Sequence, residues 1–241
     1  MHAVRALLGR RPAAVRRVVV QAGRDDRRAH ELVELARSKG VAVETRPVAE
    51  LDALAAGGVH QGVVARVAPA TPLAEEELLV RLADGARPPL VLVLDGVQDP
   101  HNLGACLRTA DAAGADAVVV PRDRAVGLTP VVRKVAAGAA ESVAFSQVTN
   151  LARFLRALKE QGLWVVGTDG EAEQLHTAAD LKGPLALVLG AEGAGMRRLT
   201  REHCDLVVRL PMLGAVQSLN VSVAAGIVLY EALRQRAAAS A

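Results

Sequence analysis

Short apolar runs and amphipathic stretches alternate in the first part of the chain. Strand-like runs rich in β-branched residues occupy positions 18–20, 41–43 and 63–67, and a stretch with helical periodicity occupies positions 26–38. The change between period 2 and period 3.6 predicts a small α/β unit.

From residue 90 onward the alternation becomes regular. Strands are predicted near 90–95, 117–121, 163–168, 185–190 and 206–210, and helices near 103–114, 130–138, 150–161, 195–203 and 219–236. Regular βα alternation predicts a parallel sheet with helices on both faces. The last helix places a set of apolar residues on one stripe at helical spacing, namely Leu219, Val223, Ile227, Tyr230 and Leu233.

A segment rich in proline and acidic residues separates these two regions. It includes Pro69, Pro72, three consecutive glutamates at 75–77, and the pair Pro88-Pro89. Such a composition predicts a linker containing one short helix. The expected division is therefore a first domain over 1–68, a linker over 69–88 and a second domain over 89–241.

Composition narrows the class of protein. Hydrophobic residues make up 51% of the chain but aromatic residues only 2%, so the core must be built from Ala, Val and Leu, as suits buried parallel strands. The apolar runs are of strand length, far short of the roughly 18–20 residues of a membrane span. The N-terminus lacks the apolar stretch of a secretory signal, so we expect a soluble, cytoplasmic protein with no membrane partner.

The two cysteines and the net charge indicate whether the protein binds a metal ion or a nucleic acid. Cys106 and Cys204 have no Cys or His at metal-ligand spacing, so we expect reduced thiols and no metal site. The net charge is only +3, but the pI is about 9.2 and arginines outnumber lysines 25 to 4. Planar guanidinium groups suit phosphate binding, which makes RNA a plausible partner. A bias in codon usage explains the arginines equally well.

The first segment with candidate chemistry is residues 94–121. A predicted strand ends at Asp95, and the loop that follows contains His101 and Asn102 before a predicted helix. In an open α/β sheet, binding sites lie at the carboxyl ends of strands. Asn102 is predicted to be the N-cap, and Arg108 follows six residues later. Taken alone, this segment is explained better by a helix cap and a solvated arginine, which are commoner than catalytic residues.

The second segment, residues 185–199, runs from a strand into the loop that contains Gly190, Glu192, Gly193 and Gly195. Glycines there let a backbone approach a ligand closely or adopt positive φ. The order of the glycines is G-x-x-G-x-G, which does not fit the G-x-G-x-x-G of a dinucleotide-binding loop. A tight strand-to-helix turn remains an alternative for this segment.

The third segment, residues 210–236, leads through a loop to Ser218 and Asn220 at a helix start, with Ser218 as the predicted N-cap. Gly226 in the middle of this helix costs about 1 kcal/mol relative to Ala. We therefore expect a helix crossing or a subunit interface at Gly226. The alternative is an ordinary amphipathic core helix.

Together and in this order, the three segments resemble the SpoU family of RNA ribose methyltransferases. The family's N-x-x-x-x-x-R motif matches Asn102 to Arg108, its glutamate matches Glu192, and its S-x-N motif matches Ser218 and Asn220. The resemblance covers essentially the whole chain. Residues 2–8 and 59–67 are similar to the branch that methylates a 23S rRNA guanosine, although relatives carry several residues ahead of His2, which points to a start upstream of Met1.

The resemblance implies a fold and a methyl donor. The second domain would be of the SPOUT type, a parallel sheet with a deep trefoil knot, which is an exception to the rule that folds are un-knotted. The first domain would resemble L30e-type ribosomal proteins and hold RNA. The knotted domain would form a homodimer, with the Gly226 helix in the contact. S-adenosylmethionine would bind in the knot, near Thr168, Gly190, Leu210, Met212 and Leu219.

The implied reaction is methyl transfer to the ribose 2′-hydroxyl of a guanosine in 23S rRNA, free or in a large-subunit assembly intermediate. The implied catalytic positions are Asn102, Arg108, Glu192, Ser218 and Asn220. A guanidinium is too basic to take a proton at neutral pH. We hypothesise that Arg108 clamps the phosphate beside the ribose while the amides and the carboxylate orient the groups around it. A proton relay through the neighbouring His101 is a second hypothesis.

Three other functions compete with this interpretation. The nearest is a family member that methylates a tRNA ribose, although simpler tRNA enzymes often lack the first domain. A protein of the same fold that binds RNA without catalysing methyl transfer, such as an assembly factor, is the second. Five filled motif positions argue against it. A dinucleotide-dependent enzyme is a remote third.

Overall fold

The computed structural model describes residues 1–55 and 59–239, and its chain divides into two compact units, residues 1–70 and 71–241. The first unit is built on a three-stranded sheet of order β2-β1-β3. Strand β1 pairs in parallel with β2 and antiparallel with β3. The elements are α1 (His2–Arg10), η1 (Pro12–Ala14), β1 (Val15–Gln21), α2 (Arg27–Ser38), β2 (Ala42–Arg46), α3 (Val48–Ala55) and β3 (Val63–Val67).

The two faces of this small sheet differ. On one face, Val18 and Val20 of β1 join Leu32 of α2 and Leu8 of α1 in a buried cluster. Because side chains alternate along a strand, the neighbouring positions of β1 lie on the other face, beside α3. The predicted small α/β unit is confirmed, but α1 and α3 were not predicted from the sequence.

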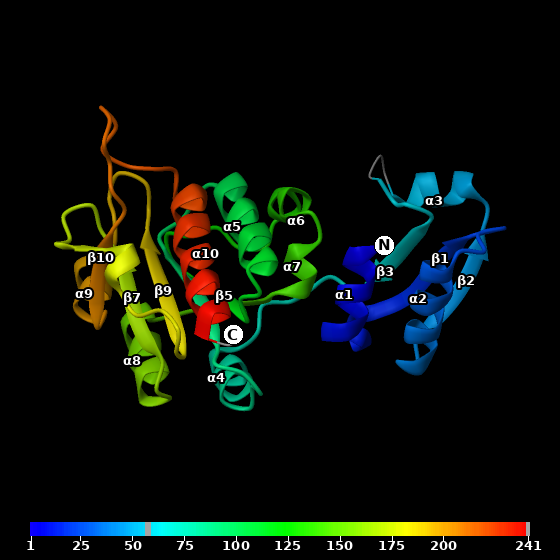
Figure 1. The fold of residues 1–241 in the computed structure, drawn as a ribbon, viewed down its shortest axis with the longest axis horizontal. Coiled ribbons are helices and arrows are strands. Elements are labelled where there is room, and N and C mark those ends of the chain that lie inside the picture. The colour runs from blue at the N-terminus through cyan, green and yellow to red at the C-terminus, as the bar shows by residue number, and fades with distance from the viewer. Residues whose placement is uncertain (56–58, 240–241) are drawn as a thin grey trace. The chain divides into compact units, whose positions relative to one another are not determined.

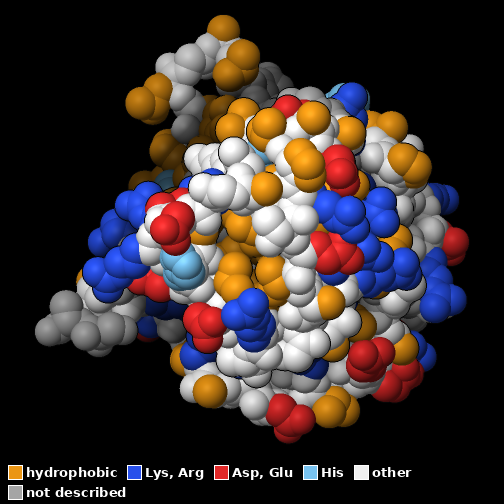
Figure 2. All heavy atoms as spheres, turned by 90° about the vertical axis from the view of Figure 1, so that its right-hand side faces the viewer, with side chains coloured by type: hydrophobic (Ala, Val, Ile, Leu, Met, Phe, Trp, Pro, Cys, Tyr) orange, Lys and Arg blue, Asp and Glu red, His pale blue; other side chains and the backbone are white. Residues whose placement is uncertain are grey.

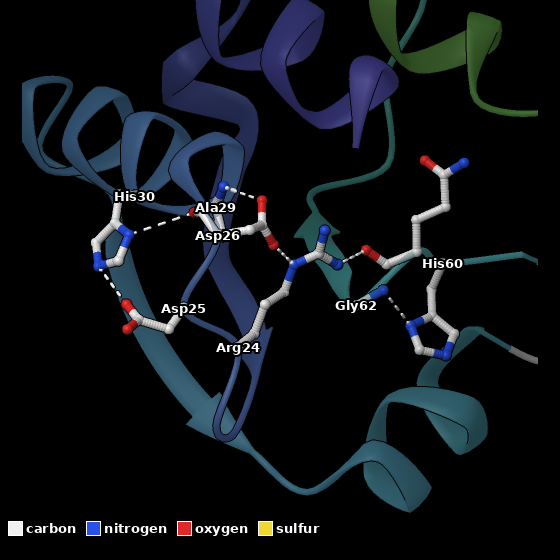
Figure 3. Close-up of polar contacts among 8 residues, drawn as sticks. Arg24, Asp25, Asp26, Ala29, His30, His60 and Gly62 are labelled. Atoms are coloured by element: carbon white, nitrogen blue, oxygen red, sulfur yellow. Dashed lines mark hydrogen bonds and ion pairs between the residues drawn. The ribbon is translucent and has the colours of Figure 1, made fainter.

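The turn before β3 is held by side chains at the start of α2 (Figure 3). Arg24 donates to the carboxylate of Asp26 and to the backbone carbonyl of Gln61. The Asp26 carboxylate also accepts from the N–H of Ala29 and so caps α2. Gly62 has φ +71°, and a Cβ at this position would overlap the Arg24 guanidinium. The N–H of Gly62 donates to Nδ1 of His60 at 3.0 Å. The segment 60–62 is thus a structural turn that fixes the start of β3.

The second unit is a seven-stranded sheet of order β6-β5-β4-β9-β7-β10-β8, in which all pairs are parallel. Its strands are β4 (Leu90–Asp95), β5 (Ala117–Pro121), β6 (Ala144–Val148), β7 (Trp164–Thr168), β8 (Gln174–Leu175), β9 (Leu185–Gly190) and β10 (Leu206–Arg209). Its helices are α4 (Glu75–Ala83), α5 (Pro100–Ala112), α6 (Pro130–Ala136), α7 (Ala139–Ser142), α8 (Leu151–Glu160), η2 (His176–Ala178), α9 (Arg198–Glu202) and α10 (Val221–Ala239). The predicted parallel sheet is confirmed.

Helices cover both faces of this sheet, as predicted (Figure 1). Leu90, Leu92 and Leu94 of β4 pack with α5, α6, α7 and α10 on one face, while Val91 and Val93 pack with α4 and α8 on the other. Helix α4 lies in the segment 69–88, and its Leu78 and Leu82 are buried in the second core. Alternate positions of one strand therefore feed two separate cores.

The order of the strands is interleaved. Strand β9 lies between β4 and β7, and β10 lies between β7 and β8, so later strands fill positions between earlier ones. This arrangement brings the carboxyl ends of β4, β9, β7 and β10 side by side. The trefoil knot itself stays a prediction from the resemblance.

Two elements of the second unit differ from the sequence prediction. The helix predicted over 130–138 ends at Ala136, because Ala137 (φ +51°) and Gly138 (φ +96°) are both left-handed, and a separate short helix, α7, which was not predicted, follows. Strand β6 was not predicted. Its Ser146 is fully buried, and the hydroxyl donates to the carbonyl of Leu73 at 2.9 Å.

The apolar stripe predicted for the last helix is not its core face. Val223, Ile227, Tyr230 and Leu233 are 37–50% exposed, and Leu219 precedes the helix. The buried face consists of Val221, Ala225, Val228, Leu229 and Ala232. Gly226 lies against α5, where an added Cβ would make an ordinary 3.5 Å contact with Thr109. Within the described residues, no helix is both long enough and apolar enough to cross a bilayer.

Candidate active site

Three polar side chains from the three predicted segments meet at the carboxyl edge of the large sheet. Nδ2 of Asn102 donates to Oε1 of Glu192 at 3.2 Å, and Nδ2 of Asn220 donates to the same oxygen at 2.6 Å. Nδ2 of Asn220 also lies 2.8 Å from Oδ1 of Asn102. We call Asn102, Glu192 and Asn220 the polar trio. Three side chains that are separated by 28 to 118 positions in the sequence thus form one hydrogen-bonded group.

Asn102 is presented by the first turn of α5. The helix begins at Pro100, three residues earlier than predicted, and its N-cap is Asp99, whose carboxylate accepts from the N–H of His101 at 2.8 Å. The prediction of Asn102 as the N-cap is therefore wrong. A proline at the first helical position and an aspartate before it are the usual signals of a helix start. Because Asp99 caps the helix, the Asn102 amide is available to Glu192.

Glu192 lies at the tip of a tight loop between β9 and α9. Ala191 and Gly195 exchange backbone hydrogen bonds of 2.9 and 3.1 Å, and Gly193 and Gly195 have positive φ. A Cβ on Gly190 would overlap the backbone of Gly195 and Met196. The glycines of the second segment therefore let the loop fold back on itself.

Asn220 occupies the N-cap position of α10. Its Oδ1 accepts from the N–H and the hydroxyl of Ser222 at 2.9 and 2.6 Å, while the N–H of Val221 donates to Glu192 at 3.3 Å. Ser218 lies outside the helix and is exposed, so the prediction that it caps α10 is wrong. One glutamate oxygen thus accepts from both amides of the trio and from the start of α10.

An ion pair between a buried aspartate and an exposed arginine, which sequence reasoning missed, anchors the Glu192 loop. Asp95, at the end of β4, is 1% exposed, and its carboxylate accepts from Nε of Arg197 at 2.6 Å and from the backbone N–H of Arg197 at 2.9 Å. Asp95 also pairs with Gly190 in the β4–β9 register. Such charge-assisted bonds fix both ends of the loop to one strand. A carboxylate that ends an all-apolar strand was the signal available in the sequence.

Arg108 and His101 do not join the polar trio. Both are exposed, and within the described part of the chain no hydrogen bond or ion pair links either side chain to Asn102, Glu192 or Asn220. Arg108 lies on α5, six residues beyond Asn102.

Four of the five residues expected around the methyl donor lie at or just beyond the carboxyl ends of three adjacent strands. Thr168 ends β7, Gly190 ends β9, and Leu210 and Met212 follow β10, while Leu219 directly precedes Asn220. Leu210, Met212 and Leu219 are half-buried. Among the described residues, positions 211–219 make no backbone–backbone hydrogen bond, so their N–H and carbonyl groups are available to a ligand. Apolar side chains beside free backbone groups fit an adenosine with a methionine tail.

Neither cysteine thiol is activated as a nucleophile. Burial raises the pKa of Cys106 and that of Cys204 to about 12, so both thiols are protonated near neutral pH. In the ranges 1–55 and 59–239, no three His, Cys, Asp or Glu side chains cluster in a way that could hold a metal ion.

Comparisons with known proteins identify the family of the chain. Residues 89–230 match the model of the SpoU rRNA Methylase family, and residues 1–73 match the model described as RNA 2′-O ribose methyltransferase substrate binding. A Pseudomonas putida protein named 23S rRNA (guanosine-2′-O-)-methyltransferase RlmB is 58% identical over 239 residues, which cover 98% of this chain and 95% of the relative.

Two solved structures are also similar. The SpoU methyltransferase AviRb from Streptomyces viridochromogenes, in complex with the cofactor AdoMet, is 26% identical with a TM-score of 0.66 and covers 98% of this chain and 89% of its own. The A. aeolicus TrmH/SpoU tRNA modifying enzyme is 32% identical with a TM-score of 0.58 and covers 70% of this chain and 87% of its own. The chain therefore belongs to the SpoU rRNA methylase family.

Proposed function

We propose that this chain transfers the methyl group of S-adenosylmethionine to the ribose 2′-hydroxyl of a guanosine in 23S rRNA. One observation carries the proposal. The amides of Asn102 and Asn220 both donate to one carboxylate oxygen of Glu192, beside the strand ends where the donor would bind. The 58% identity to a 23S rRNA guanosine methyltransferase over nearly the full chain supports the same substrate.

Bound S-adenosylmethionine supplies a methyl group on a positively charged sulfur. Transfer of this methyl group to the ribose oxygen would leave the sulfur neutral and release the hydroxyl proton. The chain's contribution is positioning. Half-buried Leu210, Met212 and Leu219 with the free backbone groups of 211–219 hold the donor, while Glu192 ties the α5 and α10 helix starts together around the reacting groups.

Arg108 is the candidate clamp for the phosphate beside the target ribose. A guanidinium can bind a phosphate through two parallel bonds, which an ammonium cannot do. We expect Arg108→Lys to lower kcat about 10-fold, the effect of losing one charge-assisted bond. His101→Ala should retain near-full turnover, because the His101 ring makes no bond to the trio. The measurement is the methyl-transfer rate with saturating RNA. The opposite pattern would favour a proton relay through His101.

The first unit is the candidate RNA-holding domain. Residues 1–70 contain 12 Lys and Arg against 7 Asp and Glu, a net charge of +5, whereas residues 71–241 contain 17 and 19, a net charge of −2. Basic side chains lie in several groups over the face of this unit shown in Figure 2. Positive charge on one domain is the electrostatic signature of a nucleic-acid partner.

A tRNA substrate is the main alternative. The A. aeolicus tRNA modifying enzyme covers 70% of this chain, whereas the P. putida 23S rRNA enzyme covers 98% of it. Full-length similarity therefore favours rRNA, either free or in a large-subunit assembly intermediate. Ribosome assembly places the reaction in the cytoplasm, which suits the two free thiols of Cys106 and Cys204.

The deciding experiment is transfer of tritiated methyl from S-adenosylmethionine to unmodified 23S rRNA and, in parallel, to unmodified tRNA. Alkali-resistant positions then map the 2′-O-methyl group. A single methylated 23S guanosine is the expected result. Methylation of tRNA alone would assign the chain to the tRNA branch, and donor binding without transfer to either RNA would favour a catalytically silent RNA-binding protein.

We further propose a homodimer through the second unit. The exposed stripe Val223, Ile227, Tyr230 and Leu233 on α10 is an apolar surface that a second copy of this chain would cover.

Light scattering after size exclusion should give twice 25.1 kDa for the wild-type chain and 25.1 kDa for Ile227→Glu. The matched control is Val80→Glu, at an exposed apolar position of α4, which should leave the mass unchanged. A wild-type monomer would contradict the proposal.

A further inference from the structure

Two arginines face each other across the small sheet of the first unit. The register of β1 and β3 places Arg17 directly opposite Arg66. Like charges at directly opposed positions of antiparallel strands destabilise a sheet. An anion bound between the two groups would remove this repulsion.

The acidic neighbours compensate one arginine of the pair. Oε1 of Glu44 accepts from Arg17 at 2.6 Å, and Oε2 of Glu44 accepts from Arg46 at 3.3 Å. Oε2 of Glu50 lies 3.9 Å from Nε of Arg46. Within the described residues, Arg66 is exposed and forms no ion pair. The acidic groups therefore hold Arg17 and Arg46 in place and leave the positive charge of Arg66 unmatched.

These residues surround a hollow of about 370 Å³. Its walls also include Val19 of β1 and Ala53 and Leu54 of α3, so it lies between α3 and the sheet face opposite to the α1–α2 core. The hollow is large enough to admit a phosphate with part of its ribose. Its charge, with three arginines and two glutamates, is complementary to an anion.

We infer that this sheet face binds the sugar–phosphate backbone of the substrate RNA, with a phosphate held between Arg17 and Arg66. The inference rests on the proposed function and names the surface by which the first unit would act. Residues 1–70 contain no Phe, Trp or Tyr, so this unit has no aromatic platform on which bases could stack. Phosphate contacts, which arginine makes bidentately, are the recognition chemistry that this face offers.

The test compares two double variants that remove the same charge from opposite faces of the unit. Arg17→Gln/Arg66→Gln alters the proposed surface, and Arg28→Gln/Arg37→Gln alters exposed positions of α2 on the other face. The probe is in vitro transcribed 23S rRNA, and the measurements are its Kd over a range of salt concentrations, with kcat and KM for methyl transfer.

The sheet-face variant should raise Kd about 10-fold at low salt and reduce the slope of log K against log salt by roughly 1. KM should rise while kcat at saturating RNA stays unchanged, because the catalytic edge is untouched. The α2 variant should change Kd less than about 2-fold, because it weakens only the non-specific, long-range attraction between the protein and the RNA. Equal weakening by both variants, or none by the sheet-face variant, would overturn the inference.

Separate controls distinguish a folding defect from a failure of the proposed function. Arg66→Gln alone removes no ion pair, so it should keep or raise Tm while still weakening RNA binding. A wild-type chain that binds this RNA without methylating it would contradict the proposed activity, whereas the comparison of the two faces would still stand.

Discussion

Exchanging Glu192 for glutamine is expected to lower kcat for methyl transfer about 100-fold, the effect of a misplacement of roughly 1 Å at the reacting groups. The carboxylate accepts from Asn102, Asn220 and the N–H of Val221 through one oxygen. A glutamine can offer one oxygen to the same donors but carries no charge, so the three hydrogen bonds lose their charge assistance and its NH2 group competes for the acceptor's position. Single-turnover rates at saturating RNA and donor measure this effect.

The control for this variant is Glu202→Gln. Glu202 ends α9, is exposed, and pairs with Arg198 one turn earlier, so its charge is lost without disturbing the trio. Its rate should match the wild type. A second check is Asn102→Ala combined with Glu192→Gln, which should lose little more than the worse single variant, because residues that act as one unit are not additive. Additive losses would mean that the two side chains act independently.

Strand prediction succeeded where the physical signal was strong. Strands β4, β5 and β9 are buried on both faces, so they are continuous apolar runs that no other element explains. Strand β6 was not predicted because the polar residues Ser146 and Gln147 interrupt its apolar run. Ser146 is tolerated in the core because its hydroxyl donates to Leu73, a partner 73 residues away that local sequence cannot reveal.

Helix starts show a related limit. Asn102 was predicted to cap α5, but the helix begins at Pro100 after the cap Asp99, and the Asn102 amide donates to Glu192 instead. The same applies to Ser218 and Asn220 before α10. In both helices the asparagine of the motif serves the trio, and for α10 it also serves as the cap. Tertiary contacts, rather than local preference, decide these boundaries.

The candidate site was identified by resemblance, and its geometry came from the structure. Asn102, Glu192 and Asn220 carry no local signal stronger than a cap or a turn, because each gains its role from partners far away in the chain. Asp95 and Arg197 were missed for the same reason: their pairing depends on β4 and β9 lying side by side. Conversely, the apolar stripe of α10 was found in the sequence but faces outward, since periodicity alone does not say which face meets the core.

Replacing Gly190 with alanine is expected to lower the free energy of unfolding by about 3 kcal/mol and the Tm of the second unit by roughly 10 °C. A Cβ at this position would overlap the backbone of Gly195 and Met196, which cannot move away without breaking the hydrogen bonds between Ala191 and Gly195. The loop that carries Glu192 would have to open, so binding of S-adenosylmethionine and methyl transfer should be lost as well. Thermal unfolding and isothermal titration with the donor measure the two effects.

The matched control is Gly170→Ala, at an exposed glycine where an added Cβ would meet nothing within 4 Å and φ is not positive. It makes the same chemical change near the same edge of the sheet, so it should leave stability within about 0.5 kcal/mol of the wild type. If both variants lost the same stability, the close approach of the backbone at Gly190 would not explain the effect of Gly190→Ala. If Gly190→Ala lost stability but still bound the donor, the loop would support the fold without shaping the donor site, and Gly190 would leave the set of cofactor-binding residues.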